Sequence, residues 1–216
     1  MTSLIFKQIF STSVNHFDAA MLIYLESFPP SERQPLAKIN ERITAKKSQL
    51  FVGILDKEVI CMALLWDFKN ADFTLLDYMA VSEKHRNNHF GSELFQFLVA
   101  KVKRSHKFML LEVENYLFGD NREQRKKRIN FYLKNGSYLL ENVPYVLPSL
   151  DKSLPLEMLL MIAPKYKNTH LKKSEIENLI KLLYKEIYEK PENDALLVSV
   201  LKKIRNKIPL KNMKIG

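Results

Sequence analysis

Apolar and polar residues follow one another in blocks that predict helices first and strands next. Two stretches with helical spacing are separated by the proline-containing segment 28–35, which cannot continue a helix. Three apolar runs come next, and short polar turns at 56–57 and 69–72 separate them. This pattern predicts two helices followed by an antiparallel three-stranded meander. The expected elements are helices Ala19–Glu26 and Leu36–Lys46 and strands Gln49–Leu55, Glu58–Phe68 and Phe73–Val81.

A strand–helix–strand unit begins with the last strand of the meander. Gly91–Lys103 carries an apolar stripe of helical period, and Met109–Val113 is the next apolar run. This order predicts two parallel strands joined by a right-handed crossover. A further helix is expected over Asn121–Asn135, ended by Gly136 where helices favour glycine. The pattern indicates an α+β domain with a mixed, mostly antiparallel central sheet flanked by helices. The late strands are expected at Tyr138–Val146 and Glu157–Ile162.

The composition changes after Pro164. Ser174–Glu189 starts with a capping-box pattern, in which Glu177 follows Ser174 by three residues, and it keeps an apolar stripe of helical period. Ala195–Ile208 has the same character after a proline break. We therefore predict an α+β domain over residues 1–163 and a basic, two-helix C-terminal extension over residues 164–216.

Charge and composition narrow the class of protein. The formal net charge is +10, and residues 165–215 hold thirteen Lys or Arg against six Asp or Glu. A polyanionic partner such as nucleic acid, a membrane surface or a phosphate-rich cofactor is compatible with this charge. The lone Cys61 lies in an apolar run and fits a reducing compartment. With neither a signal-peptide pattern nor an apolar run long enough to span a bilayer, we expect a soluble cytoplasmic protein.

The segment from Asp77 to Leu94 combines a strand end, a basic turn and a helix start. Free N–H groups at a helix N-terminus can cradle a phosphate, although a solvated surface turn explains the same residues about equally well. Val81, Arg86 and Gly91 resemble the acetyl-CoA signature of the GNAT superfamily, V-x-x-x-x-[RQ]-x-x-G-x-[GA]. Leu94 also matches, but His89 stands where the first glycine of the signature usually is. A second motif supports the resemblance, because Arg128–Gly136 resembles the family's late helix, which ends in Tyr-x-x-x-Gly.

The resemblance covers roughly residues 3–163 and implies the binding of acetyl-CoA as co-substrate. It implies that the strand ending at Val81 and the strand at 109–114 splay apart to admit the acyl-CoA. Tyr132 would give a proton or a hydrogen bond to the departing thiolate. Arg125 stands where the family often has an asparagine that contacts CoA. The cofactor-binding residues implied in this way are Ala80, Val81, Arg86, Asn88, His89, Phe90, Gly91, Ser92 and Arg125.

Three carboxylates are candidates for the base that deprotonates the amine. Side chains alternate along a strand, so Glu112 and Glu114 share one face and are expected to look into the acceptor cleft. Asp77 precedes Val81 by four residues and would share its face, unless a bulge in the strand reverses it. For Glu112 and Glu114, a solvated strand end is the competing explanation.

The function indicated is transfer of an acetyl group from acetyl-CoA to a primary amine. Two alternatives stay open: a GNAT fold that binds CoA without catalysis, and a basic module that binds nucleic acid or a protein partner. Nucleic acid is the less favoured partner, because both predicted tail helices keep an apolar stripe that should pack on protein. The histidines are scattered without metal-ligand spacing, so no metal site is expected. The acceptor and the oligomeric state are open, with a homodimer as one candidate.

Overall fold

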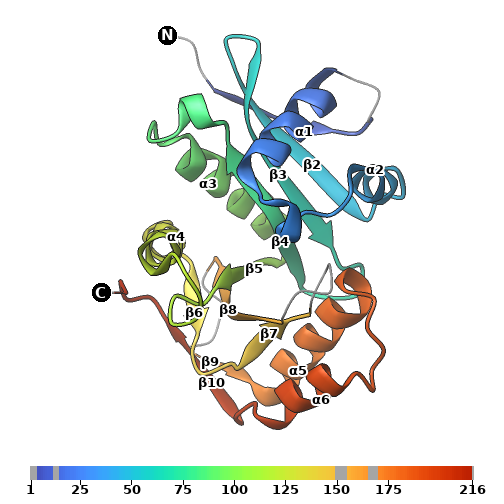
Figure 1. Ribbon diagram of the computed structural model, residues 1–216, viewed down its shortest axis with the longest axis vertical. Coiled ribbons are helices and arrows are strands. Elements are labelled where there is room, and N and C mark those ends of the chain that lie inside the picture. The colour runs from blue at the N-terminus through green and yellow to red at the C-terminus, as the bar shows by residue number, and fades with distance from the viewer. Residues whose placement is uncertain (1–3, 12–14, 149–154, 165–169, 216) are drawn as a thin grey trace. The chain divides into compact units, whose positions relative to one another are not determined.

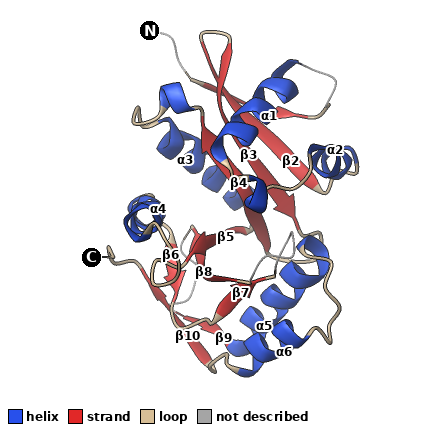
Figure 2. Ribbon diagram, in the orientation of Figure 1, coloured by secondary structure: helices blue, strands red, loops and turns tan. Residues whose placement is uncertain are grey.

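The computed structural model describes residues 4–11, 15–148, 155–164 and 170–215 (Figure 1). The chain divides into two compact units, Met1–Leu110 and Leu111–Gly216. Both units combine helices with strands, and every strand pairing with a described register is antiparallel (Figure 2). The predicted α+β class with a mostly antiparallel sheet is confirmed.

The first unit is built on four antiparallel strands, of which the last three form a meander. In spatial order they are β1 (Ile5–Ile9), β2 (Ser48–Leu55), β3 (Glu58–Asp67) and β4 (Phe73–Val81). The sequence pattern predicted the last three almost residue for residue but missed β1. The turn between β2 and β3 has positive φ angles at Asp56 (48°) and Lys57 (68°). A two-residue loop with two positive φ angles matches the right-handed twist of its strands, so this hairpin forms without glycine.

Helices cover both faces of this meander. They are α1 (Asn15–Ser27), α2 (Leu36–Thr44) and α3 (Phe90–Arg104). Tyr24 of α1 packs edge-on against Tyr78 of β4, with ring centroids 4.8 Å apart, and Ile39 of α2 belongs to the same buried cluster. On the opposite face, Phe97 of α3 packs against Phe51 of β2. Each fully buried side chain of this size contributes about 1.5–3 kcal/mol by leaving water.

Cys61 lies in the core of this unit, as its apolar neighbours predicted. It is fully buried, and burial raises the pKa of its thiol to about 12. A Cβ atom at the facing Gly53 would lie 2.4 Å from the Cys61 sulfur, so only glycine fits opposite this side chain. The thiol is therefore a packing group and an inert one.

The second unit contains strand β5 (Phe108–Glu114), which begins in the first unit, and five further strands. They are β6 (Tyr138–Leu140), β7 (Tyr145–Leu147), β8 (Leu156–Ala163), β9 (His170–Lys172) and β10 (Lys207–Lys211). Their spatial order is β5-β8-β6-β10-β9, with β7 also beside β8. The predicted strand Tyr138–Val146 is wrong as one element. It splits into β6 and β7 at Asn142, whose φ is 61°.

Helix α4 (Arg122–Lys134) precedes β6 and ends as predicted at Gly136. Gly136 has a φ of 87°, and its N–H donates to the Leu133 carbonyl (3.1 Å). The N–H of Ser137 donates to the Tyr132 carbonyl (3.0 Å). These two bonds form a Schellman motif, which satisfies the last carbonyls of the helix.

The C-terminal extension contains the two predicted helices, but their limits differ. Helix α5 (Lys173–Leu182) begins earlier, because the N–H of Lys172 donates to the Glu175 carboxylate (2.6 Å). It continues as a π-helical turn, η3 (Leu183–Ile187), and α6 (Ala195–Lys202) follows. The prediction of helix up to Ile208 was wrong. β10 buries Ile208 between exposed Lys207 and Pro209, and its pairing with β6 and β9 outweighs any helical tendency. The domain boundary at 163/164 stays a prediction.

Candidate active site

The turn between β4 and α3 contains the predicted phosphate-binding segment. One 3-10 turn, η2 (Glu83–His85), precedes the start of α3 at Phe90. The N–H of Ser82 donates to the Ile60 carbonyl (2.8 Å), and the Ser82 hydroxyl lies 2.9 Å from Nδ1 of His85. The first bond ties the start of the turn to β3, and the second contact lies within the turn. The backbone that leads into α3 is therefore preorganised.

His89 caps α3 in the left-handed conformation. Its φ is 62°, and its carbonyl accepts the N–H groups of Ser92 (2.9 Å) and Glu93 (3.1 Å). This conformation costs a non-glycine residue about 1–2 kcal/mol, which gives a physical reason for glycine at this point of the signature. Histidine enters it more readily than most residues, so the departure is tolerated. The N–H groups of Phe90 and Gly91 in the first turn have no partner within the helix and can bind an anion.

Arg86 and Asn88, both predicted to bind the cofactor, contact the protein itself. The Arg86 guanidinium donates to the Val81 carbonyl (3.3 Å) and to the Ser27 hydroxyl (3.4 Å), which fastens the end of β4 to α1. The Asn88 amide donates to the carbonyls of His85 and Arg86, at 3.3 Å each. In these contacts the two side chains shape the turn.

Asp77 occupies a bulge in β4. Leu76 faces Leu65 and Tyr78 faces Leu64 on β3, so Asp77 is the extra residue between two consecutive pairs. The bulge reverses simple alternation: Asp77 lies with Tyr78 on the face covered by α1 and α2, and Val81 lies on the other. There its carboxylate pairs with Arg42 of α2 at 3.5 Å. Burial, partly offset by Arg42, raises the pKa of Asp77 to about 6.

Glu112, on β5, is held by two tyrosines of the second unit. The hydroxyl of Tyr145 donates to its Oε1, and the hydroxyl of Tyr188 donates to its Oε2 at 2.7 Å. Burial, and then the charge of Glu112, raises the pKa of Tyr145 well above its ordinary value. The two phenols therefore act as donors, and the hydrogen bonds favour the ionised carboxylate.

Glu114, also on β5, is paired with two guanidinium groups of α4. Its Oε1 lies 3.0 Å from Arg125, and its Oε2 lies 2.6 Å from Arg128. Arg125 also donates to the carbonyls of Asn115 (3.4 Å) and Phe118, so it closes the loop between β5 and α4. Its position thus makes Arg125 an internal brace between strand, loop and helix. Both oxygens of Glu114 are taken by cations.

Tyr132 lies one turn before the Schellman end of α4. Its side chain is half-buried, and its ring contacts Phe131 with centroids 5.2 Å apart. Burial raises the pKa of Tyr132 to about 12, and the charge of Arg128 opposes this rise. The phenol is therefore protonated at neutral pH and can give a proton. The Arg128 guanidinium links it electrostatically to Glu114.

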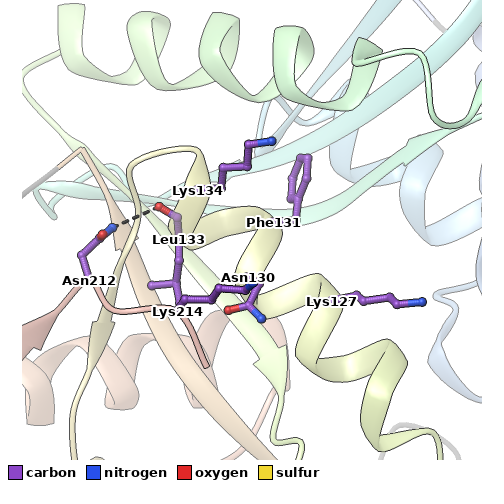
Figure 3. Close-up of a pocket in the computed structure, with 7 residues that line it drawn as sticks. All are labelled: Lys127, Asn130, Phe131, Leu133, Lys134, Asn212 and Lys214. Atoms are coloured by element: carbon purple, nitrogen blue, oxygen red, sulfur yellow. Dashed lines mark hydrogen bonds between the residues drawn. The ribbon is translucent and has the colours of Figure 1, made fainter. Parts of the chain in front are cut away.

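A hollow of about 590 Å³ lies between α4 and the C-terminal segment (Figure 3). The Asn130 amide exchanges two hydrogen bonds with the backbone of Ile215, at 2.9 and 2.8 Å, so this segment runs along the helix. Residues 127, 130, 131 and 134 share the helix face that turns away from Tyr132. The hollow is therefore separate from the Tyr132 side of α4. Its lining is Lys127, Asn130, Phe131, Leu133, Lys134, Asn212 and Lys214.

Sequence reasoning missed the partners of the candidate carboxylates: Arg42, Arg128, Tyr145 and Tyr188. A signal for Tyr188 was present, because Tyr184 and Tyr188 lie four apart on the apolar stripe of a predicted helix. A buried phenol usually finds a hydrogen-bond partner. The described residues include no group of three or more His, Cys, Asp or Glu side chains that could hold a metal ion. No described helix has the length and hydropathy to cross a membrane.

Comparison with known proteins finds one family model and several solved structures that are similar to this chain. The family model described as an acetyltransferase (GNAT) domain matches residues 46–136. None of the curated proteins matches the chain.

Among solved structures, a GNAT-family acetyltransferase of Bacteroides thetaiotaomicron is 25% identical, with a TM-score of 0.73, over 87% of this chain and 99% of that one. The ribosomal-protein-S18-alanine N-acetyltransferase of Escherichia coli is 17% identical, with a TM-score of 0.53, over 76% and 98%. A GNAT acetyltransferase of Elizabethkingia anophelis, solved with acetyl-CoA bound, is 15% identical, with a TM-score of 0.51, over 75% and 98%. The last two likenesses establish the fold.

Proposed function

We propose that the chain transfers an acetyl group from acetyl-CoA to the primary amine of an acceptor, because the GNAT acetyltransferase model matches residues 46–136. The observation that carries the proposal is the turn from β4 into α3. Left-handed His89 starts the helix there, and the N–H groups of its first turn are available for a pyrophosphate. Proteins of the same fold have been solved with acetyl-CoA bound, which supports this assignment.

In this proposal, the cofactor is held mainly by backbone groups of the first unit. The N–H groups of His89, Phe90 and Gly91 bind the pyrophosphate, and Arg86 and Asn88 keep the turn in shape. The N–H of Ser92 already donates to the His89 carbonyl, so Ser92 supports the start of the helix. Backbone groups at Ala80 and Val81 hold the thioester and the pantetheine arm, in the manner of an oxyanion hole. Arg125 acts indirectly, by bracing the loop before α4.

Among the three candidate carboxylates we assign the base to Glu112. Glu114 holds two guanidinium groups, and Asp77 lies against Arg42 on the α1–α2 face. Glu112 instead accepts hydrogen bonds from two neutral phenols, which orient the carboxylate. Glu112 accepts the proton that the amine loses, directly or through one water.

The remaining proton transfer is assigned to Tyr132. The amine nitrogen bonds to the thioester carbonyl carbon, and the carbon–sulfur bond breaks as the tetrahedral intermediate collapses. Tyr132 gives its phenolic proton to the departing thiolate, which leaves as the free thiol. A pKa near 12 keeps this proton on the phenol until the thiolate appears.

Location and assembly complete the proposal. We place the reaction in the cytoplasm, where a buried, unpaired Cys61 stays reduced. A homodimer is the proposed assembly if the C-terminal extension covers a second subunit.

Thermal melting with and without acetyl-CoA tests the cofactor assignment. A ligand that binds only the folded protein raises its melting temperature. Gly91→Glu places a negative charge at the pyrophosphate and should abolish the rise, whereas an acid in the first helical turn is compatible with folding. Lys103→Glu, in the last turn of the same helix, is the matched control and should keep the rise. An unchanged wild-type melt at saturating acetyl-CoA would refute the assignment.

A turnover screen then tests catalysis. Free thiol release is followed with acetyl-CoA and amines of different classes, including peptides and small alkyl amines. Turnover with at least one primary amine is expected. Binding of acetyl-CoA with no turnover across the screen would favour the non-catalytic GNAT fold instead.

A further inference from the structure

The side chain of Glu112 is shared between two distant parts of the second unit. Tyr145 lies on β7, and Tyr188 follows η3 in the C-terminal extension, 76 positions after Glu112. Tyr145 is completely buried, whereas Glu112 and Tyr188 are half-buried. The carboxylate therefore has a buried donor on Oε1 and a donor near the surface on Oε2.

The π-helical turn holds Tyr188 in this position. Its N–H donates to the Leu183 carbonyl (3.3 Å), five residues earlier, and its ring packs against that of Tyr184 with centroids 6.3 Å apart. The Tyr184 hydroxyl donates in turn to the Val146 carbonyl of β7 (2.6 Å). Tyr184 therefore anchors the turn to the backbone of β7, and Tyr188 donates to the carboxylate of Glu112. Single π-turns of this kind often occur at functional sites.

We propose that Tyr188 is a positioning residue for Glu112, so that the C-terminal extension takes part in recognition of a cationic primary amine. The inference rests on the proposed acetyltransferase function and on Glu112 as its base. One phenol donates to each carboxylate oxygen, and two donors at separate oxygens fix the plane of the carboxylate. A carboxylate fixed in this way meets the amine in one geometry.

Three phenols lie near Glu112 in this unit. Tyr145, Tyr184 and Tyr188 face it from β7 and from the π-turn, and Asp194 lies beside Tyr184. Burial raises the pKa of both Tyr145 and Tyr184, so these phenols stay neutral near pH 7. Loss of the Tyr188 hydroxyl removes one donor to the ionised carboxylate. The carboxylate should then take up a proton at a higher pH.

The test compares Tyr188→Phe with Tyr184→Phe in the full-length chain. Each variant removes one hydroxyl from the same π-turn, but only the first removes a bond to Glu112. For Tyr188→Phe we expect kcat/KM for the amine to fall about tenfold, with the KM for acetyl-CoA unchanged. The acidic limb of its pH–rate profile should move to higher pH. Tyr184→Phe should lower the melting temperature and leave that limb in place.

A second measurement does not depend on turnover. Carboxyl carbon spectra of protein labelled in glutamate are recorded between about pH 4 and about pH 9, with Glu112→Gln used to assign the signal. The change in the Glu112 signal should occur at higher pH in Tyr188→Phe than in the wild type. If it does so while no amine is acetylated, the positioning contact stands and the proposed function fails. If Tyr188→Phe leaves the signal, or the pH–rate profile of an active enzyme, unchanged, the positioning role is wrong.

Discussion

Replacing Asp77 by asparagine should stabilise the protein at neutral pH, although it removes a partner of a buried arginine. Asn has nearly the shape of Asp and cannot ionise. The Asp77 side chain is 14% exposed and that of Arg42 is 6% exposed, so both charges lie away from water. The question is whether the ion pair or the burial of the carboxylate dominates.

The structure indicates that burial dominates. A charge-assisted hydrogen bond is usually about 2.7–2.9 Å long, and the Asp77–Arg42 separation is 3.5 Å. The pKa of Asp77 is raised from 3.8 to about 6 even with the attraction of Arg42 included. This difference corresponds to about 3 kcal/mol by which the folded protein, with Arg42 in place, disfavours the ionised form of Asp77. Burial of the carboxylate therefore outweighs its attraction to Arg42, so the loss usually seen when a buried pair is broken should not appear.

The sign of the pH dependence follows from proton binding. The folded protein holds the Asp77 proton more tightly than the unfolded chain does. The free energy of unfolding therefore falls as the pH rises from about 4 to about 6, and this contribution is level above that range. Asp77→Asn removes the fall. The variant should match the wild type near pH 4 and exceed it by up to about 3 kcal/mol near pH 7.

Trp66 provides the assay. It is the only tryptophan in the chain, and the Arg42 guanidinium lies 4.9 Å from its ring, so its fluorescence reports unfolding at this site. Urea denaturation is measured at several pH values. Asp67→Asn is the control, because Asp67 pairs with Lys107 at 2.6 Å and is 35% exposed. A variant less stable than the wild type by more than about 1 kcal/mol near pH 7, or one that keeps the slope, would refute the reasoning.

Two further predictions concern catalysis and the C-terminal extension. Tyr132→Phe keeps the ring and removes the hydroxyl, so kcat should fall about 10²-fold while acetyl-CoA affinity and melting temperature change little. If the variant and the wild type have equal kcat while the chemical step limits the rate, Tyr132 is not the proton donor. Deleting residues 165–216 removes β10 and Tyr188, so the second unit should lose its cooperative unfolding transition. The unfolding transition of the first unit, followed by Trp66 fluorescence, should persist. Circular dichroism reports both units, so comparing it with the fluorescence separates their two transitions. A truncated chain with a second unit as stable as before would show that the extension contributes nothing to it.

Much of the first unit could be predicted because its pattern is local. Long apolar strands separated by short polar turns gave β2, β3 and β4, and Gly136 marked the end of α4. β1 escaped prediction because it is short and only Ile9 among its residues is buried, so it lacks a clear apolar pattern. β10 escaped because its lysines and Pro209 resemble the end of a basic helix, and only pairing with β6 and β9 makes it a strand.

The carboxylates show where sequence reasoning about a site stops. Alternation drew attention to Glu112 and Glu114, but it treated them as equivalent. Their partners distinguish them: two arginines of α4 hold Glu114, and a tyrosine 76 positions away contacts Glu112. Neither pairing follows from spacing along the chain. Both depend on how β5, α4 and the π-turn pack in three dimensions.

The bulge at Asp77 also determines where β4 could change length during evolution. Leu76 and Tyr78 already face consecutive residues of β3, so loss of Asp77 alone would join two correctly paired segments into a regular strand. Loss of any neighbouring residue would instead move one segment to the opposite face. One-residue deletions among related chains should therefore collect at this position. The extra residue is a site where the gene can gain or lose a codon while every other side chain of the strand keeps its face.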